Sequence, residues 1–104
     1  MDKRKDIVVA PYDPSWPQVF AEEARIIRNV LGDKALEIHH VGSTSVPGLD
    51  SKPIIDVILV AENWANLKTE LQKVGYIYKG EFNIPLHWGF SKTMPFPINL
   101  HGYE

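Results

Sequence analysis

The chain has 104 residues, which is enough for one domain and too short for two. Apolar residues make up 44%, charged residues 23%, and the net charge is −2, so the composition lacks the basic surface needed for strong nucleic-acid binding. Without cysteine, disulfides and thiolate metal sites are excluded. No apolar stretch approaches a membrane span, so we expect a cytoplasmic protein with no membrane partner.

The first predicted element is a short extended segment at residues 7–9, followed by turn residues. From Trp16 to Leu31, apolar side chains recur every three or four residues, which predicts a helix with one buried face. Pro14 or Pro17 suits its first turn, and Gly32 suits its end. We expect the charged residues of this helix to form a solvated face: Glu22, Glu23, Arg25 and Arg28.

A strand is expected at residues 35–41. Alternation places Leu36, Ile38 and His40 on one face and His39 on the other. The two histidines are therefore a poor pair for one metal ion.

A second strand is expected at residues 54–60, where a β-branched run is interrupted only by Asp56. Such a run predicts a strand covered on both faces. An ionisable group in this strand is costly unless it is paired, bound to a metal or placed at a cleft. Asp56 is therefore the first candidate for a functional residue.

A second helix is expected after Ala61, with Asn63 as its cap and Gly75 at its end. Short strands are expected at residues 76–79, 86–90 and 98–103. This order predicts an α+β domain with a mixed β-sheet and helices packed mainly on one face.

A turn of small and hydroxyl residues, at positions 42–48, separates the first two of these core strands. A Gly-Ser turn after a strand can present N–H groups and hydroxyls to a phosphate, and a carboxylate on the next strand can hold a Mg²⁺ ion that bridges to it. The alternative is an ordinary turn beside an Asp that forms a cap or an ion pair. The candidate phosphate ligands are Gly42, Ser43, Thr44, Ser45 and Lys52, and the candidate metal-binding and catalytic residue is Asp56.

Two stretches of the chain are unusual strings: IVVAPYDPSWPQVFAEEA at residues 7–24 and HHVGSTSVPGLDSKPIIDV at residues 39–57. With them the chain resembles the GrpB family of the polymerase-β-type nucleotidyltransferase superfamily. The resemblance weakens beyond Val60 and returns at residues 99–101, which are similar to a His-x-His strand of the family. It implies a single nucleotidyltransferase-fold domain over residues 1–104, with His40 and His101 as further candidates for contacting a phosphate.

The chain departs from the family pattern at two positions. The resemblance implies a second strand carboxylate at position 58, where this chain has Ile58, and Asn99 replaces a histidine. Family members continue past this point, so we expect a shortened member that lacks the C-terminal part of the family. Three carboxylates without motif support could supply another metal ligand: Asp50, Glu81 and Glu104.

Two functions are compatible with these residues. The first is binding of a nucleotide or another phosphorylated small molecule, with Mg²⁺ as cofactor and weak or no transferase activity. The alternative is an active Mg²⁺-dependent nucleotidyltransferase that transfers a nucleoside monophosphate to an acceptor. Ile58 favours binding over catalysis, because a hydrocarbon cannot coordinate Mg²⁺. Sheet surface left uncovered by missing helices would favour a homo-oligomer.

Overall fold

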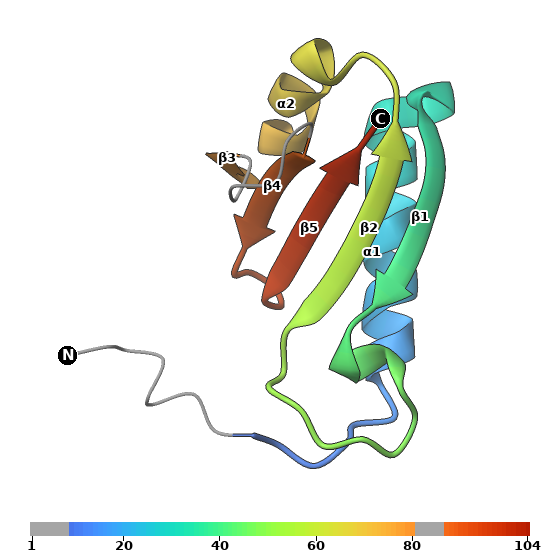
Figure 1. The fold of residues 1–104 in the computed structure, drawn as a ribbon, viewed down its shortest axis with the longest axis vertical. Coiled ribbons are helices and arrows are strands. Elements are labelled where there is room, and N and C mark those ends of the chain that lie inside the picture. The colour runs from blue at the N-terminus through green and yellow to red at the C-terminus, as the bar shows by residue number, and fades with distance from the viewer. Residues whose placement is uncertain (1–8, 81–86) are drawn as a thin grey trace, which may run out of the picture.

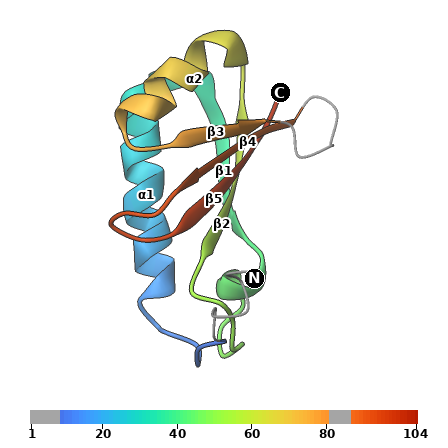
Figure 2. The same ribbon diagram turned by 90° about the vertical axis from the view of Figure 1, so that its left-hand side faces the viewer.

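The computed structural model describes residues 9–80 and 87–104. Two helices, α1 (Trp16–Leu31) and α2 (Trp64–Lys73), lie on the same side of a β-sheet (Figures 1 and 2). The strands are β1 (Ala35–Val41), β2 (Ile55–Ala61), β3 (Ile77–Gly80), β4 (His87–Lys92) and β5 (Ile98–Tyr103). In the part of the chain that is described, no helix is both long and apolar enough to cross a membrane.

The five described strands form one mixed sheet in the order β1-β2-β5-β4-β3. Strands β2 and β5 are parallel, and every other neighbouring pair is antiparallel. The predicted α+β class, with helices mainly on one face, is confirmed. The predicted helix Trp16–Leu31 and the strands at 35–41 and 98–103 have the predicted bounds.

Strand β2 is buried on one face only. Ile55, Val57 and Leu59 have no exposed surface, whereas Asp56 and Ile58 on the opposite face are half-buried. The prediction that this strand is covered on both faces was wrong, because α1 and α2 pack on the same side of the sheet (Figure 2). We call the other side the open face. It carries Glu37, His39, Asp56, Ile58, Asn99 and His101.

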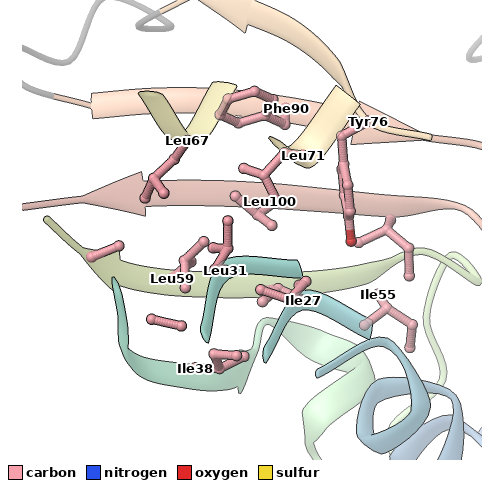
Figure 3. Close-up of a cluster of buried hydrophobic side chains, with 14 of the residues drawn as sticks. Ile27, Leu31, Ile38, Ile55, Leu59, Leu67, Leu71, Tyr76, Phe90 and Leu100 are labelled. Carbon is pink, nitrogen blue, oxygen red and sulfur yellow. The ribbon is translucent and has the colours of Figure 1, made fainter. Parts of the chain in front are cut away.

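The hydrophobic core fills the space between the sheet and the two helices (Figure 3). Ile27 and Leu31 from α1 meet Leu67 and Leu71 from α2 over the centre of the sheet. Trp16, the first apolar residue of the predicted buried helix face, is only 2% exposed. Because this burial removes apolar area from water, it supplies the main stabilisation of the fold.

The indole of Trp64 packs directly over Gly102. A Cβ atom at Gly102 would lie 2.3 Å from Trp64 Cη2, so no larger residue fits there without movement. The indole stacks on Trp88 with ring centroids 5.3 Å apart, and its Nε1–H donates to the Tyr103 carbonyl at 3.1 Å. The N-terminus of α2 is thereby held against β4 and β5.

Glu23 of α1 is buried, so the prediction that it belongs to a solvated face was wrong. Its carboxylate accepts a hydrogen bond from the Tyr76 hydroxyl at 3.1 Å and forms an ion pair with the buried Lys92. Lys92 Nζ also donates to the Val74 carbonyl at 3.1 Å. Burial, and next the Glu23 carboxylate, raise the pKa of Tyr76. This network joins α1 to β4 and to the segment that follows α2.

Strand β1 contains a bulge between Ala35 and Glu37, which changes the direction of its first side chains. Ala35 and Ile38 are buried, whereas Leu36 is 51% exposed, so the predicted alternation, which placed Leu36 on the same face as Ile38, does not hold at this position. Beyond the bulge the prediction holds, and the two histidines point to opposite faces. The start of the segment predicted at residues 7–9, the residue Leu86 and the candidate Glu81 lie outside the described residues.

Candidate functional site

A cleft of about 520 Å³ opens at the end of the sheet that contains the C-terminal end of β1 and the N-terminal end of β2. We call it the Asp56 cleft. It is lined by Val9, Ser43, Asp50, Ser51, Lys52, Ile54, Asp56 and Asn99. Ser43, a candidate phosphate ligand, and Asp56, the candidate metal-binding residue, therefore share one cleft.

Gly42 of the turn packs against the side chain of Asp56. Its backbone angles are φ 76° and ψ −173°, a combination that is essentially restricted to glycine. A Cβ atom at this position would lie 2.6 Å from Asp56 Oδ2 and 3.3 Å from Asp56 Cγ. Gly42 is thus required both by the backbone and by the carboxylate that packs against it.

Ser51 links the cleft to the N-terminal segment. Its backbone N–H donates to the Ala10 carbonyl at 2.9 Å, and its carbonyl accepts from the Ala10 N–H at 2.8 Å. Its hydroxyl is hydrogen-bonded to that of Ser43 and donates to the Lys52 carbonyl at 2.9 Å. Sequence reasoning missed Ser51, because its role depends on a bridge between two distant segments.

The N-terminal segment also holds Asp50 in place through a hydrogen bond. Its Oδ1 atom accepts a hydrogen bond from the Tyr12 backbone N–H at 3.2 Å. The two unusual sequence stretches therefore contact each other: the first holds the loop on which the second places the cleft residues.

Three of the predicted phosphate contacts, Thr44, Ser45 and His40, are not among the residues that line the cleft. Thr44 is fully buried, and its hydroxyl donates to the Ile54 carbonyl at 3.3 Å and contacts His40 Nε2 at 3.0 Å. The Ser45 hydroxyl donates to the Gly42 carbonyl at 2.6 Å. His40 stacks on Phe20 of α1 at a centroid distance of 4.9 Å. These side chains stabilise the turn from within.

The environment of His40 affects its protonation. Burial lowers the pKa of its imidazole, and the negative charge of Asp56 opposes this effect. A neutral His40 can donate from Nε2 to the Thr44 hydroxyl, whose own proton goes to the Ile54 carbonyl.

His101 lies next to Asp56 on the open face. Strand register pairs Asp56 with Asn99, and Ile58 with His101. The His101 Nε2 atom is 3.9 Å from Asp56 Oδ1. Ile58 occupies the following row of the same face, so the position expected for a second carboxylate carries a hydrocarbon.

The other candidate carboxylates differ in where they lie. Asp50 lines the Asp56 cleft, whereas Glu104 follows the far end of β5. Glu104 is five positions beyond Asn99, which is about 17 Å along an extended strand. Only Asp50 is therefore placed to act together with Asp56 among the described candidates.

Within residues 9–80 and 87–104, no group of three or more His, Cys, Asp or Glu residues is arranged to hold a metal ion. A site built only from these side chains is therefore not formed. Mg²⁺ in nucleotide sites is usually held by one or two carboxylates together with substrate phosphates and water. The oxygen donors of Asp56 and Asp50 fit that second arrangement.

The charges of the cleft decide what it can attract. Its lining contains two carboxylates, Asp50 and Asp56, and one ammonium group, Lys52. A phosphate alone would therefore meet a net negative surface. A divalent cation on the carboxylates would reverse that sign.

These features define a class of protein: an α+β domain with helices on one face of a mixed sheet and a polar cleft between a Gly-Ser turn and a strand carboxylate. The model of the family described as GrpB protein matches residues 6–104, and this chain belongs to that family.

Similar proteins support this assignment. The chain is 56% identical over 73 residues to "UPF0157 protein BH1888" from Halalkalibacterium halodurans, covering 67% of this chain and 37% of that protein. It is 46% identical over 92 residues to "UPF0157 protein PA4798" from Pseudomonas aeruginosa, covering 86% and 38%. The crystal structure of conserved protein GrpB from Enterococcus faecalis matches with a TM-score of 0.83 and 34% identity, over 92% of this chain and 61% of that one. The chain thus spans less than two fifths of the length of the two sequence relatives.

Proposed function

We propose that this protein binds a nucleotide or another phosphorylated small molecule in the Asp56 cleft, with Mg²⁺ as cofactor and weak or no transferase activity. The observation that carries the proposal is the packing of the Asp56 carboxylate against Gly42, in the cleft that Ser43 and Lys52 also line. A turn hydroxyl, a cation and a carboxylate are the groups that a phosphate and its metal ion require.

In this proposal each group has a separate task. Asp56 would hold Mg²⁺, and Asp50 would contribute a second oxygen donor. Ser43 and Lys52 would contact phosphate oxygens, Lys52 as a point charge on a flexible stem. The bound Mg²⁺ supplies positive charge that neutralises the phosphates. Because the cleft without metal carries more negative than positive side chains, phosphate binding should require the cation.

Weak catalysis follows from the position of Ile58. In a two-metal nucleotidyl transfer, the metal ions stabilise negative charge on both the attacking and the leaving oxygen. Each metal ion needs carboxylate ligands. Ile58 lies on the open face beside Asp56 but offers no oxygen. Loss of one well-placed electrostatic group typically lowers the rate about 100- to 1000-fold.

The second candidate, an active nucleotidyltransferase, is favoured by one observation: Asp50 lines the same cleft as Asp56. Two carboxylates could then serve the metal without a residue at position 58. In the reaction, the oxygen of an acceptor hydroxyl bonds to the α-phosphorus, the bond to the bridging oxygen breaks, and pyrophosphate leaves. The hydroxyl proton passes to solvent.

A thermal-shift and calorimetry panel with the four ribonucleoside triphosphates tests binding. We expect stabilisation only when Mg²⁺ and nucleotide are both present, and its loss in Asp56→Asn. Asp33→Asn, which removes an exposed carboxylate outside the cleft, is the matched control and should bind normally. Stabilisation that is unchanged in Asp56→Asn would overturn the proposal.

Pyrophosphate release separates the two candidates. The unmodified protein should show turnover far below about one per second, the lower end of ordinary enzyme rates. Ile58→Asp should raise the rate from this low level. Turnover near one per second that both Asp50→Asn and Asp56→Asn abolish would establish the active transferase instead.

A further inference from the structure

A second cavity, of about 440 Å³, lies between α1 and the connection from β4 to β5. Figure 2 shows this connection reaching alongside α1. We call it the α1 cavity. It is lined by Ser15, Gln18, Val19, Glu22, Glu23, Ile26, Pro95 and Phe96. No described residue lines both this cavity and the Asp56 cleft, and its volume is typical of sites for small molecules.

The spacing of residues along α1 gives the cavity one continuous wall. Val19, Glu22, Glu23 and Ile26 follow one another within two turns, at the intervals that bring side chains to one helix face. Val19 and Phe96 are half-buried and pack against the hydrophobic core, and Ile26 is also half-buried. These three side chains give the cavity an apolar surface.

Glu23 adds a fixed charged group to this surface. Its side chain is only 5% exposed, and its Oε1 atom receives the contacts with Tyr76 and Lys92. An ionised carboxylate has about four acceptor sites on its two oxygens. The two partners therefore hold the carboxylate in place and leave it the capacity to accept a donor from a ligand.

Glu22 is the carboxylate that a ligand reaches from solvent. Its side chain is 57% exposed and forms an ion pair with Arg25, which is exposed as well and does not line the cavity. Exposed ion pairs contribute little to stability, because water screens them. Glu22 can therefore exchange Arg25 for the cationic group of a ligand at little cost.

The lining distinguishes between classes of ligand. The described residues of the cavity include two carboxylates and no cationic side chain, so an anion would be repelled. A neutral apolar molecule would cover the apolar surface but would also remove water from Glu22 without replacing its hydrogen bonds. An ammonium group replaces those hydrogen bonds and compensates the charge.

We propose that the α1 cavity binds an organic cation, a small molecule with an apolar body and a primary ammonium group. The apolar body lies on Val19, Ile26 and Phe96, and the ammonium group donates to Glu22 and Glu23. This site does not depend on the proposed function of the Asp56 cleft.

The first test compares two probes that differ only in charge. Tryptamine carries an ammonium group at pH 7, and tryptophol has a neutral hydroxyl in its place. In a ¹H–¹⁵N titration of the full chain, tryptamine should shift the amide signals of Val19, Ile26 and Phe96 and leave those of Ser43 and Asp56 unchanged. Tryptophol should bind about 10-fold more weakly, because it lacks the charged donor. Equal affinity of the two probes, or shifts outside the cavity, would overturn the proposal.

The second test removes the accessible carboxylate. Glu22→Gln should weaken tryptamine binding about 10-fold and leave tryptophol binding unchanged. Glu70→Gln is the matched control, because Glu70 also pairs with a cation three residues further along its helix, Lys73, and lies outside the cavity. Neither glutamate is buried, so both variants should fold. If both variants bind tryptamine equally well, the proposal is refuted.

A second copy of this chain is the competing occupant of the α1 cavity. It would shift the amide signals of Val19, Ile26 and Phe96 as the protein concentration rises, without any probe, and sedimentation would then show a dimer. That result would overturn the proposal of a small-molecule site. Signals that stay constant with concentration and move only with tryptamine would support it.

Discussion

Substituting Gly42 by alanine tests the contact on which the Asp56 cleft depends. The backbone of Gly42, at φ 76° and ψ −173°, costs a residue with a side chain about 1–3 kcal/mol. In addition, the new Cβ would lie 2.6 Å from Asp56 Oδ2. The Asp56 carboxylate must move away, because Asp56 Cβ and Cγ would also lie only 3.3 Å from the new alanine Cβ.

Gly32→Ala is the matched control. Gly32 also has a positive φ, 60°, with ψ −135°, but a Cβ there would meet nothing within 4 Å. Both variants should therefore lose stability for the same backbone reason. For a domain of this size, each kcal/mol lowers Tm by about 4–8 °C. Only Gly42→Ala should also displace Asp56.

The assay is the shift in Tm that Mg²⁺ and ATP together produce in each variant, beside the Tm without ligand. We expect both variants to melt earlier, while only Gly42→Ala loses the ligand-dependent shift, corresponding to affinity at least about 10-fold weaker. If Gly42→Ala retained the same ligand-dependent shift as Gly32→Ala, the contact between the turn and the carboxylate would not matter for binding.

Three further predictions concern the fold. Lys92→Met leaves the buried carboxylate of Glu23 without its cation, so the free energy of unfolding in urea should fall by about 3–5 kcal/mol; a loss below about 1 kcal/mol would contradict the ion pair. Gly102→Ala forces a Cβ to within 2.3 Å of Trp64, and should destabilise by about 1–3 kcal/mol or more and alter tryptophan fluorescence; an unchanged spectrum and Tm would show that the indole has room to move. Burial lowers the pKa of His40 below 6.5 in the folded protein, so the unfolded chain binds this proton more readily than the folded chain does. The contribution of neutral His40 to the free energy of unfolding should therefore be complete above about pH 6.5. It should decline as the pH falls through the folded-state pKa. His40→Gln should flatten this decline in urea unfolding curves, and an identical pH profile would refute it.

The sequence determined the elements whose signals are local. The spacing of apolar residues set helix α1 from Trp16 to Leu31, and alternation set β5 from Ile98 to Tyr103. The turn at Gly42 and the single carboxylate in β2 also indicated that Ser43 and Asp56 would meet, because two consecutive strands joined by a short segment tend to pair. The phosphate and metal roles of these residues stay predictions.

Only the tertiary structure decided which faces of these elements are covered. Helix α1 shows its apolar stripe in sequence, but the pairing of Glu23 with Lys92 joins residues far apart in the chain, and no local period encodes it. The open side of β2 likewise depends on both helices packing on one face, and the place of Asn99 beside Asp56 depends on the parallel pairing of β2 with β5. The local spacing of apolar residues predicts the conformation of a segment. The partners of its side chains across the sheet depend instead on strand register and on packing between segments that are distant in sequence.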